Sequence, residues 1–290
     1  MLDLEQEMSR CRVCPRKCGA DREHGKTGYC KAPSGVAAAR AALHFWEEPC
    51  ISGTTGSGTV FFSGCNLRCV YCQNHHIAEM ESGKVISIGR LSDIFLELQA
   101  QNANNINLVT PSHYVLQIRE ALFQAKKKGL TVPVVYNCGG YESVEALQAL
   151  DGLIDIYLTD FKYMDSSLAK VYSRAEDYPE TAKRALAEMV RQTGEAVFDE
   201  NGLMKKGVIV RHLLLPGAVK NAKAVVKYVY ETGDEKDELP RLPKARRGGC
   251  EPVGNGTAAA PFELAAMSGT GRSRYRAAKK TAVPSIRVVP

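Results

Sequence analysis

The middle of the chain alternates short apolar runs with longer segments whose apolar residues recur at helical spacing. The short runs are rich in β-branched and aromatic residues, which is typical of strands buried on both faces of a parallel sheet. Five such runs are present: residues 59–63, 106–110, 132–137, 154–160 and 208–215. Each is followed by an amphipathic segment that we expect to be a helix: residues 91–100, 115–128, 143–150, 180–193 and 221–232. This order predicts consecutive βαβ units with right-handed crossovers.

The repeats carry no Rossmann glycine fingerprint, so they favour an open, partial barrel over a doubly wound sheet. We therefore predict an α/β fold of the partial-barrel type over residues 51–232, preceded by a cysteine-rich, metal-binding extension over residues 1–50. Polar residues gather where the predicted strands end. Active sites of parallel barrels lie at the carboxyl ends of the strands, so we expect the active site at this edge.

Charge and hydropathy exclude some classes of protein. The net charge is +6, but residues 233–290 hold 11 of the 38 basic and 6 of the 32 acidic residues. The first 232 residues are therefore nearly neutral, and no nucleic-acid partner is expected. The N-terminus lacks the basic and apolar stretches of a secretory signal, and no run of about 18 apolar residues predicts a membrane span. We expect a soluble, cytoplasmic protein.

Ten cysteines in such a chain favour metal binding over disulfides. Three of them, Cys65, Cys69 and Cys72, have CxxxCxxC spacing in the loop after the first predicted strand, which we call the triplet loop (residues 63–72). Structural zinc needs four ligands, whereas three thiolates suit a 4Fe–4S cluster with one open iron. The alternatives are three buried core cysteines, or zinc completed by His75 or His76.

The CxxxCxxC loop, with aromatic Tyr71 before its last cysteine, resembles that of the radical SAM superfamily. This resemblance implies a partial (β/α)6 barrel and a 4Fe–4S cluster on Cys65, Cys69 and Cys72. The open iron of the cluster would chelate S-adenosylmethionine. Reductive cleavage of S-adenosylmethionine would then yield a 5′-deoxyadenosyl radical that abstracts hydrogen.

Within the superfamily, the sequence is similar to pyruvate formate-lyase activating enzyme. Four stretches carry the similarity: residues 58–78, 105–114, 154–163 and 210–217. The resemblance implies an oxidoreductase-like activating enzyme with a protein substrate and a reducing electron donor such as flavodoxin or ferredoxin.

Polar residues at other strand ends are candidates for binding S-adenosylmethionine. The resemblance implies that Asp160 and Lys162 lie near it, although the pair could also be a plain salt bridge. Thr110 and Asn137 also end predicted strands and could bond the amino acid or ribose part of the ligand. The activating enzymes carry a Gly-Gly-Glu type motif after the second strand, where this chain has Thr110. Arg211 lies inside an apolar strand, where a charge needs a partner: it could meet a carboxylate, and a structural ion pair is an equally good interpretation.

A second group of cysteines, Cys11, Cys14, Cys18 and Cys30, lies in what we call the N-terminal cysteine segment (residues 11–30). Four thiolates could hold either auxiliary zinc or a second iron–sulfur cluster. A nucleic-acid-binding zinc ribbon is the rival interpretation, but it would expect paired CxxC knuckles and interleaved aromatic residues.

Residues 233–290 lose all periodicity and have the composition of disorder. A (β/α)6 barrel needs a sixth strand after the last predicted helix, and none is legible there. Our hypothesis is that the reading frame shifts near residue 232, which would leave five barrel strands and an uncovered edge.

The sequence leaves three functions in competition. The leading one is a radical SAM enzyme that acts on a protein partner. The others are a radical SAM enzyme that acts on a small molecule, and a zinc-binding module without catalysis.

Overall fold

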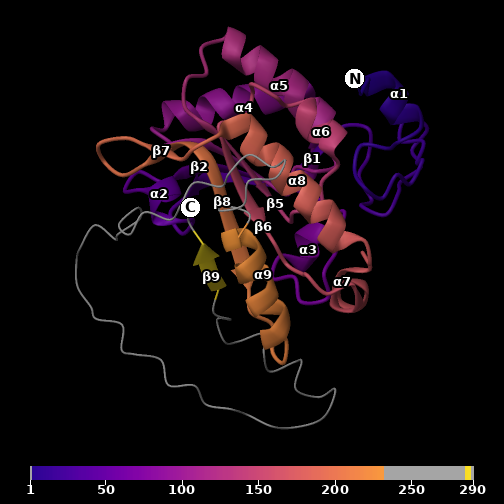
Figure 1. Ribbon diagram of the computed structural model, residues 1–290. Helices are drawn as coiled ribbons and strands as arrows, with labels where there is room; N and C mark the ends of the chain where they lie inside the picture. Colours follow the sequence, from indigo (N-terminus) through magenta and orange to yellow (C-terminus); the bar gives the residue numbers. More distant parts are fainter. Residues whose placement is uncertain (1, 232–284, 289–290) are drawn as a thin grey trace.

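The computed structural model describes residues 2–231 and 285–288, and its centre is a single sheet (Figure 1). Eight strands follow one another in the spatial order β3-β1-β2-β4-β5-β6-β8-β7, and a ninth, β9, pairs with β8. The strands are β1 (Val36–His44), β2 (Ser57–Phe62), β3 (Lys84–Ile86), β4 (Ile106–Val109), β5 (Val134–Cys138), β6 (Ile156–Asp160), β7 (Val197–Phe198), β8 (Met204–Leu213) and β9 (Ser285–Val288).

The centre of the sheet is parallel. Strands β2, β4, β5, β6 and β8 pair with one another in that order and run in one direction. They correspond to the five predicted strands, so this part of the prediction is confirmed. Because the five strands are parallel, their carboxyl ends share one edge of the sheet, which positions the loops that follow them.

The ends of the sheet differ from the prediction. Antiparallel β1 and β3 extend the sheet beyond β2, and antiparallel β7 and β9 pair with β8. The sheet is open, and the curvature of a barrel is not shown. Within the tail, where no strand is legible in the sequence, Ser285–Val288 forms β9, which pairs antiparallel with β8 from Val210 to Leu213. The rest of the tail, and the proposed frame shift, lie outside the described residues.

Helices cover the sheet (Figure 1). In sequence order they are α1 (Leu4–Ser9), α2 (Pro49–Ser52), α3 (His75–Ala78), α4 (Ile88–Ala100), α5 (Val115–Lys127), α6 (Val144–Gln148), α7 (Ser166–Ser173), α8 (Tyr178–Thr193) and α9 (Val219–Glu231). Helices α4, α5, α6 and α8 pack side by side as one layer, and α9 packs on β8. The five predicted helices are confirmed as α4, α5, α6, α8 and α9. Helices α1, α2, α3 and α7 were not predicted.

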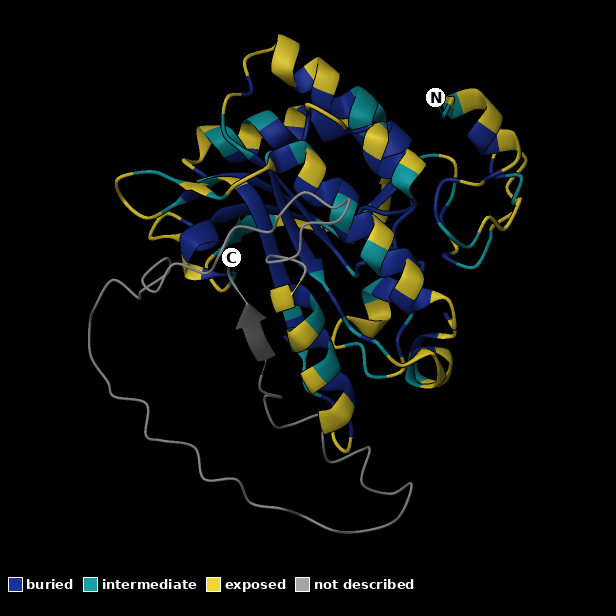
Figure 2. Ribbon diagram, in the orientation of Figure 1, coloured by how far each residue is buried: buried dark blue, intermediate teal, exposed yellow. Residues whose placement is uncertain are grey.

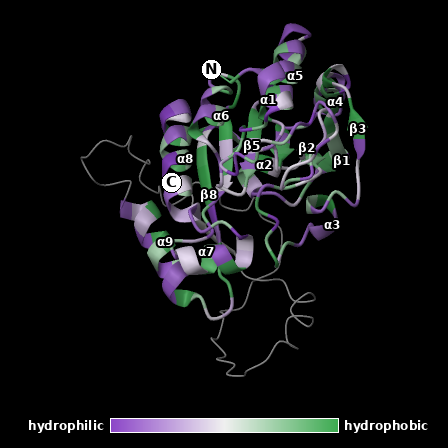
Figure 3. Cartoon of the chain, turned by 90° about the vertical axis from the view of Figure 1, so that its right-hand side faces the viewer, coloured by the Kyte–Doolittle hydropathy of each residue, from purple (hydrophilic) through white to green (hydrophobic). Residues whose placement is uncertain are grey.

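The alternation of side chains along a strand separates two cores. In β6, Tyr157 belongs to the main core, which includes the helical layer, whereas Ile156 and Leu158 belong to a second core. Cys50 and Ile51 of α2 complete this second core from the other face of the sheet. Figure 2 shows the central strands buried, and Figure 3 shows the largely hydrophobic β8 beside the more hydrophilic α8.

Within residues 2–231 and 285–288, no helix combines the length and apolarity that a membrane crossing requires.

A buried carboxyl group lies just beyond β5. Glu142 is only 2% exposed, and it accepts hydrogen bonds from Ser112 Oγ at 2.6 Å and Tyr136 OH at 3.0 Å. Burial raises the pKa of Glu142 from 4.5 to about 7 because removal from water disfavours the carboxylate. The folded state therefore holds this proton more tightly than the unfolded chain does.

This shift predicts a pH-dependent contribution to stability. The contribution of Glu142 is complete below pH 4.5 and is lost as the pH rises through about 7, because the folded pKa is the higher one. The loss approaches about 3 kcal/mol. Glu142→Gln removes this titration. The free energy of unfolding, measured by chemical denaturation between pH 4 and pH 8, should therefore be similar for wild type and variant at low pH and differ increasingly as the pH rises. Parallel curves across this range would contradict the prediction.

Candidate functional site

The triplet loop leaves the carboxyl end of β2 through a glycine. Gly64 has φ +88°, and a Cβ at this position would lie 2.5 Å from the carbonyl oxygen of Cys30. Both the left-handed backbone and this close approach require glycine. The loop is therefore packed directly against the N-terminal cysteine segment.

The three thiols of the triplet loop differ in exposure and partners. Cys69 is buried, and Cys65 and Cys72 are half-buried. The Cys65 Sγ accepts hydrogen bonds at 3.4 Å from the backbone N–H groups of Leu67 and Arg68, and these donors favour a thiolate. The backbone N–H of Cys72 donates to the Cys69 carbonyl at 3.0 Å and closes the turn between the two ligands.

A small pocket that opens to solvent lies beside the loop. Its lining includes Cys65 and Cys72 of the triplet loop, Asn74 after it, and Val109 and Thr110 at the end of β4. Three thiols beside a pocket fit a metal cluster that keeps one position open for a ligand.

The electrostatics of the loop also fit a cationic group. Burial and the neighbouring Cys69 raise the pKa of Cys65 to about 12, and burial raises the pKa of Cys72. Three thiolates in one small volume repel one another and are costly without positive charge. Iron would supply that charge and displace the protons.

Two basic residues brace the triplet loop. The Arg16 guanidinium donates to the carbonyls of Asn66 and Ser173, both at 2.9 Å, and stacks 4.0 Å from the Tyr29 ring. Arg68, inside the loop, forms a two-pronged ion pair with Glu79. These contacts tie the loop to the N-terminal cysteine segment and to α7.

A charged group lies at the carboxyl ends of β5, β6 and β8. Asn137, Asp160 and Arg211 are in phase with the second-core residues of their strands, so they share one face of the sheet. Asp160 pairs with Lys162 at 2.5 Å and with Arg211 Nε at 3.0 Å. The pair with Asp160 is a structural ion pair of Arg211 with a carboxylate, one of the two interpretations that the sequence offered. Arg211 also donates to Asn137 Oδ1 at 2.7 Å.

The group at the strand ends is electrostatically connected to the triplet loop. Burial works against the charged form of Lys162, but Asp160 and then Cys69 raise its pKa above the usual range. Burial opposes ionisation of Asp160, yet Lys162 and Arg211 lower its pKa. Asp160 and Lys162 therefore stay charged near the cysteines. Asn137 is held on its other side by Glu47, which accepts from Asn137 Nδ2 at 3.4 Å.

Thr110 has a strained backbone. Its φ is +59°, a left-handed conformation that costs a β-branched residue about 1 kcal/mol or more. A hydrogen bond from Thr110 N to the Asn137 carbonyl at 2.9 Å maintains it. This strained residue lines the same pocket as Cys65 and Cys72.

The N-terminal cysteine segment brings its thiols together around a buried arginine. Cys11, Cys14 and Cys30 are buried, and Cys18 is exposed. A hydrogen bond from Cys11 lowers the pKa of Cys18 to about 5. Arg22, 2% exposed, donates to Cys30 Sγ at 3.7 Å. Its charge offsets that of the thiolates, which fits a metal-binding role.

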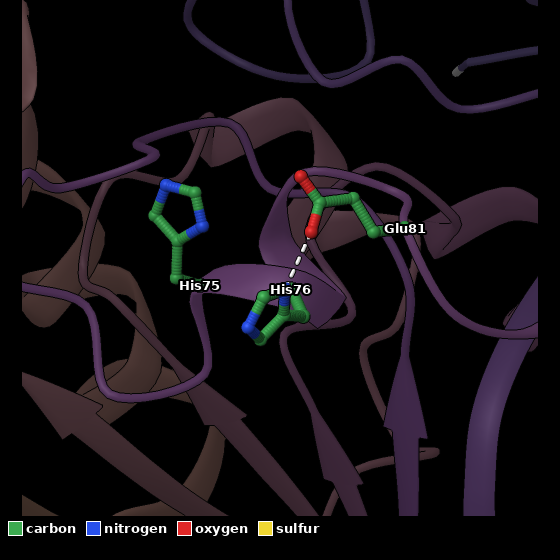
Figure 4. A group of neighbouring side chains, drawn as sticks. All are labelled: His75, His76 and Glu81. Carbon is green, nitrogen blue, oxygen red and sulfur yellow. Dashed lines mark hydrogen bonds and ion pairs between the residues drawn. The ribbon is translucent and has the colours of Figure 1, made fainter.

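The histidines next to the triplet loop form a separate group. His75, His76 and Glu81 place ligand atoms within 4.8 Å of one another, and all three are exposed (Figure 4). In the part of the chain that the structure describes, no cysteine joins these histidines in a group of this spacing. The contact of 2.5 Å between His76 Nδ1 and Glu81 Oε2 has the character of a surface ion pair.

Three contributors to the site have no signature in the sequence. Arg16 braces the triplet loop, Glu47 holds Asn137, and Ser173 donates to Cys69 Sγ at 2.9 Å. Arg16 lies in a cysteine-rich turn, where a basic residue is explained equally well by thiolate charge. Glu47 and Ser173 belong to segments without a motif, so only their positions in the fold identify them.

An open α/β sheet with three cysteines after its first parallel strand defines a class of metal-dependent enzymes. The model of the Radical SAM superfamily matches residues 59–206, and this chain belongs to that superfamily. Its members bind a 4Fe–4S cluster and cleave S-adenosylmethionine.

The chain is also similar to an uncharacterized protein of Methanocaldococcus jannaschii, with 29% identity over 232 residues. The match covers 74% of this chain and 61% of the archaeal protein, so the chain spans less than two thirds of that relative.

The close approach at Gly64 predicts a specific sensitivity. Gly64→Ala should lower the free energy of unfolding by at least about 2 kcal/mol, because the new Cβ collides with the Cys30 carbonyl. The same substitution should lower the iron content of the protein. Gly152→Ala is the matched control, since Gly152 has φ +78° but open space around it, and should cost about 1 kcal/mol. Equal effects of the two substitutions on iron content would refute the packing argument.

Proposed function

We propose that this chain is a radical SAM enzyme whose 4Fe–4S cluster is bound by Cys65, Cys69 and Cys72, and that it abstracts hydrogen from a protein partner. One observation carries the first part: Cys65 and Cys72 line a pocket together with residues at the carboxyl ends of β2 and β4, and the third thiol of the same loop, Cys69, is buried. The charged Asp160–Lys162 pair lies beside them.

Bound there, the cluster would supply one electron that cleaves the sulfonium of S-adenosylmethionine to methionine and a 5′-deoxyadenosyl radical. Lys162 and Asp160 offer one cationic and one anionic group to the charged ends of S-adenosylmethionine. Thr110 lines the pocket from β4 and takes the position of the Gly-Gly-Glu type motif. Asn137 orients Arg211 and Asp160, because its amide oxygen accepts from Arg211. Tyr71 completes the cluster-binding motif.

Exposed apolar residues beside the site support a protein substrate. Trp46 is 86% exposed and directly precedes Glu47, which holds Asn137 at the strand ends. Val70, between two cluster ligands, is 51% exposed. Exposed aromatic residues are enriched where proteins bind one another. The similarity to pyruvate formate-lyase activating enzyme supports the same role, that of a glycyl-radical-enzyme activase.

We also propose that Cys11, Cys14, Cys18 and Cys30 bind an auxiliary metal, either zinc or a second iron–sulfur cluster. The buried Arg22 guanidinium beside Cys30 supports this, because it balances thiolate charge among three buried cysteines. Radical SAM enzymes generally take electrons from a donor such as flavodoxin or ferredoxin, and we expect one here.

Cleavage of S-adenosylmethionine tests the proposal directly. The anaerobically reconstituted protein should be brown, hold about four irons at the triplet loop, and form 5′-deoxyadenosine after reduction with dithionite. Cys69→Ala should abolish this product, whereas Cys50→Ala, a change in the second core, should retain it. A colourless protein that contains only zinc would refute the radical function. About eight irons would assign a second cluster to the N-terminal cysteine segment, and four irons with one zinc would assign zinc.

Transfer of deuterium separates the partner classes. Pyruvate formate-lyase labelled with deuterated glycine serves as the probe, with unlabelled enzyme as the control. An activase should incorporate one deuterium into 5′-deoxyadenosine and leave a glycyl radical visible by electron paramagnetic resonance. Cleavage of S-adenosylmethionine without either signal would reject this protein substrate.

A further inference from the structure

A buried serine contacts one ligand of the proposed cluster. Ser173, the last residue of α7, is fully buried, and its Oγ donates a hydrogen bond to Cys69 Sγ at 2.9 Å. Cys69 and Ser173 are 104 positions apart in the chain, so the contact is a product of the fold. Cys69 is itself buried, with 7% of the residue exposed.

The serine hydroxyl is the end of a chain of three hydroxyl groups. The Tyr163 OH lies 2.8 Å from Ser173 Oγ, and the Tyr71 OH lies 2.6 Å from the Tyr163 OH. A metal-bound thiolate carries no proton, so Ser173 must donate to it. Ser173 then accepts from Tyr163, and Tyr163 accepts from Tyr71. All three O–H dipoles therefore point toward the sulfur, and each strengthens the next.

The backbone around Ser173 is fixed independently of this hydroxyl. Arg16 donates to the Ser173 carbonyl at 2.9 Å, and the N–H of Val70 donates to the Tyr172 carbonyl at 2.9 Å. Asp165 caps the start of α7 by accepting from the N–H groups of Ser167 and Leu168. Removal of the hydroxyl alone should therefore leave α7 in place.

We propose that Ser173 is a positioning residue that sets the reduction potential of the cluster, with Tyr163 and Tyr71 as its supports. The proposal rests on the proposed function, because it requires a cluster on Cys69. Reduction adds negative charge to the cluster and its sulfur ligands. A donor aimed at one of those sulfurs stabilises the reduced form more than the oxidised form, and so raises the potential.

The test is a potentiometric titration of the reconstituted cluster, followed by electron paramagnetic resonance. Ser173→Ala should lower the equilibrium constant for reduction about tenfold, which is 59 mV for one electron. Tyr163→Phe should shift the potential in the same direction by less, because Ser173 keeps its own O–H. Ser92→Ala is the control, since it removes an equally buried serine hydroxyl, on α4, and should leave the potential unchanged.

The outcomes separate this proposal from the proposed function. A wild-type protein that binds no 4Fe–4S cluster refutes the proposed function. An intact cluster whose potential is the same in wild type and Ser173→Ala refutes the role of Ser173 alone. If Ser173→Ala fails to assemble a cluster, Tyr163→Phe decides: a lowered potential supports the hydroxyl chain, and an unchanged potential overturns it.

Discussion

The site depends on the fixation of the triplet loop from outside, because a short loop cannot hold three mutually repelling thiols in place alone. The N-terminal cysteine segment closes on Gly64 through the Cys30 carbonyl. Arg16 joins the loop carbonyl of Asn66 to the end of α7, which also presents Ser173 to the buried thiol. Two segments distant in sequence, the N-terminal cysteine segment and α7, thus fix the ten residues of the triplet loop, so the loop geometry depends on contacts across the fold.

Side chains along a strand alternate between the two faces of the sheet, and this alternation governs the rest of the site. Residues that face one side of the sheet fill the core under the helical layer, and residues that face the other side fill the second core against α2. At the carboxyl ends, the second set changes from apolar to polar at Asn137, Asp160 and Arg211. A burial pattern that stabilises the sheet therefore also brings polar groups from three strands into contact.

The sequence predicted the parallel strands and the longer helices well, because their patterns are set by burial on the sheet. It did not predict β1, since Val36–His44 is alanine-rich and lacks the β-branched residues typical of strands. The three cysteines proposed as ligands follow from their spacing in the sequence alone. Ser173 and Arg16 could not be found in this way, because their contacts span 104 and 50 positions and have no local pattern.

The position of Arg16 couples the amino-terminal residues to the triplet loop. Arg16 lies in the turn between Cys14 and Cys18, and its guanidinium satisfies carbonyls on both the triplet loop and α7. The triplet loop and α7 share these bonds with the N-terminal turn, so none of the three segments keeps its full set of contacts when another is displaced. A disturbance of the amino-terminal residues is therefore felt at the loop that holds Cys65, Cys69 and Cys72.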